Sequence, residues 1–178
     1  MVSDMRLAPR LVPFLAAVLL LPSCAHSPAQ PTESTMALGE KVILGHITYT
    51  VFETQWLTQI PQDPTPRIPQ SRFFLIRLSA VNSGGTEVNI PNLTVQDDTG
   101  KSYSELSNGD GVPQWIGFLR SVKPTDSIQG NIVFDAPPQH YKIRLTDENG
   151  ERAAFVDLPL NFSSGGSEIQ VPVAPVKK

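Results

Sequence analysis

Apolar and polar residues alternate with a period of two along most of the chain between residues 47 and 158. Successive side chains of a β-strand point to opposite faces, so this alternation predicts half-buried strands. The 17 prolines and 12 glycines divide the chain into short apolar runs. No stretch shows helical periodicity long enough to predict a helix. The predicted strands are 47–56, 73–81, 87–90, 93–97, 101–103, 128–134, 141–145 and 154–158.

Two of these segments carry more detail. Residues 73–81 are apolar at both alternating sets of positions except Arg77 and Ser79, which predicts a central strand covered on one face and partly covered on the other. The apolar phase shifts near Phe52, which predicts a β-bulge there. Seven or eight short strands separated by turns favour an all-β, two-sheet, immunoglobulin-like β-sandwich, with a small barrel as the alternative.

The first 23 residues have the composition of a signal peptide. Arg6 and Arg10 precede an apolar stretch, 11–21, that is shorter than the roughly 20 residues a membrane-spanning helix needs. The residues that follow resemble a bacterial lipobox: Leu21, Pro22, Ser23 and Cys24. The alternative is an ordinary signal peptide with a chance cysteine near its end.

The lipobox resemblance implies that the Cys24 sulfur accepts diacylglycerol and that its freed amine takes a further acyl chain, such as palmitate. Two or more chains give stable membrane anchoring. Because Ala25 rather than aspartate follows the cysteine, the expected location is the cell envelope, at the outer membrane if the organism is Gram-negative. Cys24 is the only cysteine, so the domain is expected to fold without an internal disulfide.

The chain therefore divides into four predicted parts. Residues 1–23 are a lipoprotein signal peptide, and residues 24–37 are the lipidated cysteine with a disordered polar tether. Residues 38–160 form the immunoglobulin-like β-sandwich, and 161–178 form a flexible tail.

The charge balance excludes one class of partner. The formal net charge is -3, and the lysines and arginines are scattered rather than clustered. Nucleic-acid binding needs a basic face that displaces counterions from phosphates, so no nucleic acid is expected.

Several ordered motifs carry a family resemblance. The motifs are Leu38-Gly39-Glu40, Tyr49-Thr50-Val51, Phe74 through Asn82-Ser83-Gly84, Asp97-Asp98-Thr99-Gly100-Lys101-Ser102-Tyr103, Lys123-Pro124, Gly130, and Phe134-Asp135-Ala136-Pro137. In this order they resemble the bacterial domain-of-unknown-function family 4352. The resemblance implies an immunoglobulin-like fold, a secreted lipoprotein, and kinship in fold with a mycobacterial immunoprotective antigen, and it supplies no catalytic or ligand residues.

The chain departs from this family pattern at two places. Pro124 is followed by Thr125 where the family usually has glycine, and we expect Thr125 to keep a negative φ. A proline-rich insert, 61–69, lengthens the connection into the central strand at little cost in loop entropy.

No catalytic or metal-binding arrangement stands out. His46 and His140 are the only histidines of the predicted domain, and neither has a nucleophile motif or a close-spaced metal ligand. Asp97-Asp98 and the run 108–111 lack calcium-loop spacing, so we expect them to form turns. The expectation is a non-enzyme without a metal or cofactor.

One apolar segment is a candidate contact site. Trp115, Ile116, Phe118 and Leu119 lie between two turn-prone stretches, and if exposed they would form a partner-binding patch. The alternative is that they pack over one end of the sandwich. Trp56 is expected to pack in the core.

These observations predict a noncatalytic, lipid-anchored envelope module that binds a protein or glycan partner. The alternative is a structural or assembly accessory that docks by an exposed strand edge onto an envelope complex. A hydrolase is the third hypothesis.

Overall fold

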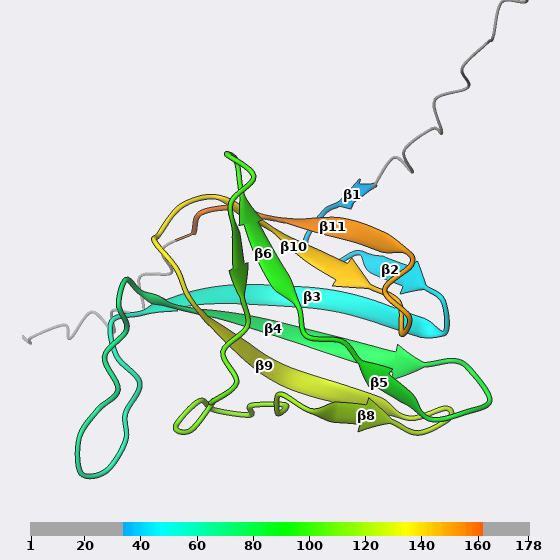
Figure 1. Cartoon of the computed structure of the whole chain (residues 1–178), viewed down its shortest axis with the longest axis horizontal. Helices are drawn as coiled ribbons and strands as arrows, with labels where there is room; N and C mark the ends of the chain where they lie inside the picture. The colour runs from blue at the N-terminus through cyan, green and yellow to red at the C-terminus, as the bar shows by residue number, and fades with distance from the viewer. Residues whose placement is uncertain (1–33, 162–178) are drawn as a thin grey trace, which may run out of the picture. The chain divides into compact units, whose positions relative to one another are not determined.

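The computed structural model describes residues 34–161, and its regular elements are all β-strands (Figure 1). None of the described segments forms a helix that could cross a membrane. Cys24, the predicted signal peptide and nearly all of the predicted tail lie outside the described residues. The strands are β1 (Thr35–Met36), β2 (Lys41–Leu44), β3 (Ile47–Leu57), β4 (Phe73–Asn82), β5 (Val88–Ile90), β6 (Thr94–Asp97), β7 (Ser102–Ser104), β8 (Arg120–Val122), β9 (Ser127–Asp135), β10 (Tyr141–Thr146) and β11 (Ala153–Leu158).

The strands form three hydrogen-bonded sheets. One has the order β1-β11-β10-β6-β7, the second β2-β3-β4-β9, and a small ribbon pairs β5 with β8. Strand β1 runs parallel to β11, and the other pairs are antiparallel. The two larger sheets lie face to face in Figure 1, with β5 and β8 together at one end of β4 and β9.

The main core lies between the two larger sheets. Ile143 and Val156 from one sheet and Ile76 and Phe134 from the other are each shielded from solvent and belong to one cluster. The Tyr49 hydroxyl crosses the core and donates to the Thr146 carbonyl at 2.9 Å. The fold is therefore an all-β sandwich, as the alternation of residues predicts, and the sheets do not close into a barrel.

A second, smaller cluster covers part of the outer face of β4. Phe73, Leu75 and Val133 point away from the main core and pack under Ile60 and Val112 from two long loops. Residues 73–76 of β4 are consequently buried on both faces. This confirms the prediction of a central strand.

The predicted bulge is also present. The pairing of β3 with β4 shifts between Val51 and Glu53, and Phe52 is the extra residue. Phe52 is exposed, whereas Val51 remains in the core.

Within residues 34–161, eleven strands replace the seven or eight that the alternation predicts. The additional strands are β1, β2 and β8, which have two, four and three residues. The three-residue strands β5 and β7 are predicted, so length alone is not the reason; in β8 one of the two buried positions is Arg120, which does not continue an apolar pattern. Strand β1 also corrects a predicted boundary, because Thr35–Met36 falls within the segment 24–37 assigned to the tether.

Thr125 contradicts the sequence expectation. Its φ is +63°, in the left-handed region, whereas a negative φ was expected. The turn fixes this conformation from both sides, because the Thr125 N–H donates to the Asn82 carbonyl at 3.0 Å and the Asn82 N–H donates to the Asp126 carbonyl at 3.0 Å.

Candidate functional site

The ridge segment, residues 113–119, connects Val112 to β8 and contains the predicted apolar patch. Asn131 of β9 holds it by three hydrogen bonds. The Asn131 side chain donates to the Pro113 carbonyl at 2.7 Å, its backbone N–H donates to the Gln114 carbonyl at 2.9 Å, and its carbonyl accepts from the Ile116 N–H at 3.2 Å. The first half of the ridge segment is thus fixed along the edge of β9.

Trp115 and Ile116 pack against the domain. Trp115 covers the second cluster, and Ile116 packs against the main core. Both contacts require glycine beneath them: an ideal Cβ at Gly109 would lie 2.1 Å from the indole, and one at Gly130 would lie 2.6 Å from an Ile116 methyl carbon. These two residues therefore pack against the domain along the edge of β9 rather than over one end of the sandwich.

The second half of the ridge segment turns outward. Gly117 has a φ of +82°, a conformation that glycine adopts without steric cost. Phe118 beyond it is half-buried, and the Leu119 side chain is 91% exposed. The structure thus divides the predicted patch: Trp115 and Ile116 pack against the two clusters, Phe118 is half-buried, and Leu119 is exposed.

A buried ion pair lies directly behind Leu119. Arg120 Nη1 and Nη2 donate to Glu105 Oε1 and Oε2 at 2.6 and 2.9 Å, and both side chains are almost completely buried. Breaking such a pair by removing one partner typically costs about 3–5 kcal/mol of stability, because the remaining charge stays buried.

The same ion pair fixes the surrounding backbone. Arg120 Nη1 also donates to the Gly117 carbonyl at 2.7 Å, and Nη2 donates to the Pro91 carbonyl at 3.3 Å. Glu105 Oε2 accepts the Leu93 N–H at 3.3 Å. The outward turn that carries Leu119 is therefore rigidly supported.

Two surface grooves, each of about 540 Å³, flank the ridge segment. Trp115 and Ile116 line the first, the edge groove, and Phe118 and Leu119 line the second, the ribbon groove. The edge groove is completed by Arg77, Gln114, Ile128 and Gln129. The ribbon groove is completed by Asn89, Ile90, Pro91, Asn92, Arg120 and Ser121.

The two histidines of the domain lie elsewhere and contact carboxylates. His140 Nδ1 lies 2.7 Å from Asp98 Oδ1, and His140 Nε2 lies 2.9 Å from Asp157 Oδ1. These hydrogen bonds, that to Asp98 foremost, raise the pKa of His140 above its usual value.

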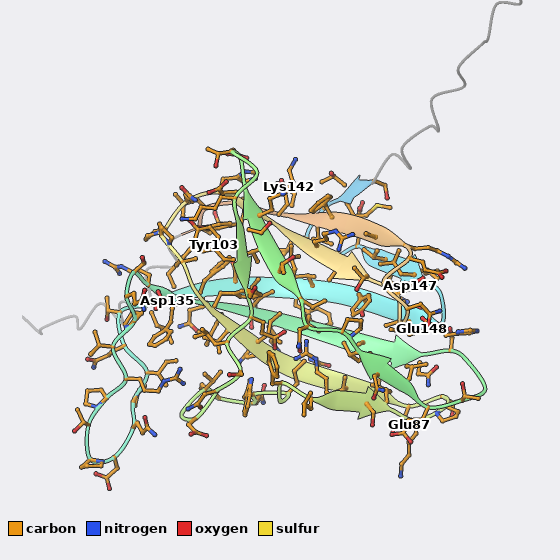
Figure 2. All side chains as sticks on the ribbon, viewed as in Figure 1. Glu87, Tyr103, Asp135, Lys142, Asp147 and Glu148 are labelled. Atoms are coloured by element: carbon orange, nitrogen blue, oxygen red, sulfur yellow. The ribbon has the colours of Figure 1, made fainter. Side chains whose placement is uncertain are left out.

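His46 forms the second histidine contact. Its Nδ1 lies 2.5 Å from Glu148 Oε1. Glu148 and Asp147 occupy the turn between β10 and β11 (Figure 2). The Glu148 pKa is lowered, first by a hydrogen bond from its own backbone N–H and then by the bond to His46.

Neither histidine forms a nucleophile–base pair. Within residues 34–161, no serine or threonine hydroxyl is hydrogen-bonded to either imidazole ring. Each ring instead links two surface segments through carboxylates.

The acidic turns act as the sequence predicts. Asp97 Oδ1 accepts the backbone N–H groups of Thr99 and Lys101, both at 2.9 Å, and so closes the turn after β6. Asn108 Oδ1 accepts the Asp110 N–H at 2.7 Å. Among the residues described, no group of three or more His, Cys, Asp or Glu side chains is placed to hold a metal ion.

One further carboxylate anchors the proline-rich insert. Asp135 lies at the base of the long loop between β3 and β4 (Figure 2). Its two oxygens accept the N–H groups of Gln70 and Ser71 at 2.6 and 2.9 Å. The insert is therefore fixed at its end nearest β4.

Sequence reasoning missed the Arg120–Glu105 pair. A signal was present, because Arg120 and Val122 are two residues apart and both are buried on one face of β8. A charged residue in phase with an apolar one indicates a buried charge that needs a partner. The partner itself lies 15 residues away, and no spacing rule identifies it.

Comparison with known proteins places the chain among uncharacterised domains. A family model described as "Domain of unknown function (DUF4352)" matches residues 36–153. The search of curated proteins found no match.

Solved structures show the same fold at low sequence identity. The secreted protein MPT63 from Mycobacterium tuberculosis is 16% identical with a TM-score of 0.54, over 73% of this chain and 99% of that one. The yjhA protein from Bacillus subtilis is 16% identical with a TM-score of 0.51, over 68% and 98%. An uncharacterized β-sandwich protein from Clostridium difficile 630 is 13% identical with a TM-score of 0.49, over 72% and 95%.

Proposed function

Since the chain belongs to the DUF4352 family of domains of unknown function, we propose a role from the features of its own surface. The protein is a noncatalytic binding module of the cell envelope, and it contacts a partner protein through the ridge segment. In this proposal Cys24 carries the lipid anchor and the sandwich presents Leu119 and Phe118 to the partner. The likeness of the fold to a secreted protein supports export.

The observation that carries the proposal is the rigid exposure of Leu119. The side chain is 91% exposed, yet its backbone is supported by the buried Arg120–Glu105 pair. A contact residue that is already ordered loses less entropy on binding than a flexible one. The fold therefore stabilises a conformation that leaves a leucine in water.

The surroundings of Leu119 fit a protein contact. Phe118 adds apolar surface next to it, and Asn89, Asn92 and Ser121 are exposed and polar around the ribbon groove. Protein interfaces typically combine an apolar centre with a polar rim. A glycan ligand is the competing outcome, because amide side chains beside an aromatic ring also suit sugars.

The arrangement of the histidines supports a noncatalytic role. His46 and His140 each connect surface segments through carboxylates, and both grooves described above are lined by other residues. A hydrolase would need a nucleophile in contact with one of these rings.

Site-specific photo-crosslinking in the native host tests the proposal. A photo-reactive amino acid replaces Leu119 in one strain and Ile43, which is 71% exposed on β2, in a control strain. We expect a discrete protein adduct at position 119 and none at position 43. Leu119→Ser is expected to reduce recovery of that partner at least about fivefold, as for an interface residue worth more than about 1 kcal/mol.

The matched control is Ile43→Ser, which removes another largely exposed aliphatic side chain. Both serine variants are expected to unfold at the wild-type temperature, since neither side chain is buried. Equal recovery of the partner with Leu119→Ser, or a glycan adduct in place of a protein, would contradict the proposed contact.

A further inference from the structure

We infer that the free edge of β9 at Ser127–Gln129 takes up an extended segment of the partner protein as an added strand, with an aliphatic side chain in the edge groove and a carboxylate on Arg77. The inference rests on the proposed function and specifies how the partner is held. It concerns the edge groove, whereas the test above concerns Leu119.

The two edges of β9 differ in their pairing. One edge pairs with β4 over the whole of Ser127–Asp135. On the other edge, the Val133 carbonyl accepts the Leu106 N–H, and Asn131 bonds to the ridge segment with both backbone groups. Backbone groups of a strand point to the same edge at every second residue, so those of Gln129 and Ser127 point the same way.

Beyond Asn131 this edge is open. Among residues 34–161, no other strand or loop segment donates to or accepts from the Gln129 backbone on that side. The Ser127 N–H is taken by the neighbouring Asp126 carboxylate at 2.8 Å. Three main-chain groups are therefore available: the Gln129 N–H, the Gln129 carbonyl and the Ser127 carbonyl.

The ridge segment begins to fill this edge and then leaves it. It runs parallel to β9 with Trp115 opposite Asn131, and Ile116 makes its last hydrogen bond to that strand. Gly117 then turns the chain outward, and Arg120 holds the Gly117 carbonyl. The fold thus keeps its own chain off the remaining edge by the same buried ion pair that supports Leu119.

The open edge lacks the usual protection against pairing. Natural edge strands are commonly blocked by lysine, proline or a bulge. Ser127, Ile128 and Gln129 include none of these residues, and the pairing of this stretch with β4 is regular. An unblocked edge beside a groove is the feature used in recognition by strand addition.

The groove also defines the side chains that fit. Ile116 and Ile128 provide apolar wall, which suits one aliphatic side chain. Arg77 is 37% exposed at the same groove, and its ion pair with Glu53 spans 3.3 Å at the surface. Such an exposed pair contributes little by itself, so a carboxylate from the partner can bind Arg77 at small cost. A groove of about 540 Å³ admits a few residues of an extended peptide.

The test uses the isotope-labelled full chain in detergent and a synthetic pentapeptide, acetyl-Thr-Val-Glu-Val-Thr-amide. Amide hydrogen exchange of Gln129 is followed by NMR. We expect the peptide to slow exchange of this amide at least 10-fold and to shift the signals of Ile116 and Ile128. The control is the same peptide with N-methyl groups on its central amides, which keeps the side chains but cannot donate backbone hydrogen bonds. We expect this peptide to leave the exchange rate of the Gln129 amide unchanged.

Two variants form the matched pair. Gln129→Pro removes the outward N–H without removing a bond to β4, and proline is tolerated at such edge positions. It is expected to abolish peptide binding, whereas Gln129→Ala keeps the backbone and is expected to bind within about threefold of wild type. If Gln129→Pro does not fold, the N-methylated peptide on the wild-type protein decides the question.

Several outcomes would overturn the inference. They are equal protection by the N-methylated peptide, the absence of any effect at Gln129 at millimolar peptide, and protection of Gln129 without peptide. In the last case, dependence on protein concentration would indicate a second copy of the chain, and independence would indicate a segment of the same chain. A protein adduct at Leu119 would still stand in each case, so the proposed function and this inference can fail separately.

Discussion

Thr125 occupies a backbone conformation that suits glycine better. A left-handed conformation costs an L-residue about 1–2 kcal/mol, because Cβ crowds the following carbonyl oxygen. Its φ of +63° is imposed by the hydrogen bonds between the turn and Asn82. Since the Thr125 side chain is exposed, no packing in the described domain compensates for this cost.

Replacing this residue should stabilise the domain. Thr125→Gly relieves the steric cost but adds flexibility to the unfolded chain, so the expected net gain is about 0.5–1 kcal/mol. Urea unfolding measured by circular dichroism checks the value. Thr125→Ala is the control, because it retains Cβ and is expected to gain less stability. A lower free energy of unfolding in the glycine variant would contradict the claim that the backbone of Thr125 is strained.

His140 connects three elements at one side of the sandwich. It lies just before β10, Asp98 lies in the turn between β6 and β7, and Asp157 belongs to β11. Both carboxylates favour the protonated ring, and Lys142, opposite Asp157 in the strand register, is a competing cation on β10. Protonated His140 can donate to both carboxylates at once, whereas the neutral ring can donate to only one.

This arrangement predicts a pH-dependent contribution to stability. The His140 pKa is raised in the folded state, so its contribution is complete below the unfolded value near 6.5 and is lost as the pH rises through the folded pKa. Urea unfolding of wild type and His140→Gln should therefore differ more at pH 6 than at pH 9. A difference that is constant over this range would contradict the role of the proton.

The contribution of the Glu148 contact to stability depends on pH in the opposite direction. Its pKa is lowered in the folded state, so its contribution is present above the unfolded value near 4.5 and is lost as the pH falls. Because the two effects lie in different pH ranges, the His140→Gln comparison separates them.

At the level of elements, the sequence predicts all the long strands, and among the short ones it predicts β5 and β7 but misses β1, β2 and β8. The bulge at Phe52 and the burial of residues 73–76 on both faces can be predicted from the sequence, because the long strands have many alternating positions that show which face each residue takes. Strand β8 has only three residues, and its buried Arg120 looks like a surface position when read alone. The sequence also could not distinguish Trp115 from Leu119, because their different exposure depends on Gly117 and on the distant Glu105.

At the level of the whole molecule, the proposed lipid anchor determines where the domain works. We expect the native protein to carry a diacylglyceryl group on Cys24 and to partition into detergent, since two or more acyl chains anchor a protein stably in a bilayer. Mass spectrometry of the N-terminal peptide and detergent phase separation check this. Cys24→Ala should carry no acyl mass, and recovery of wild type with a free thiol would contradict the anchor.

The parallel pairing of β1 with β11 bears on how such an anchored domain withstands force. The Phe155 N–H donates to the Ser34 carbonyl at 2.9 Å, and Thr35 and Met36 align with Phe155 and Val156. A force that pulls the N-terminal end of β1 along the strand direction would load all the hydrogen bonds between β1 and β11 at the same time, in shear. A force across the strands would instead break them one after another. Tension between a bilayer and a bound partner would therefore act first on this two-residue contact and leave the packed sheets behind it undisturbed.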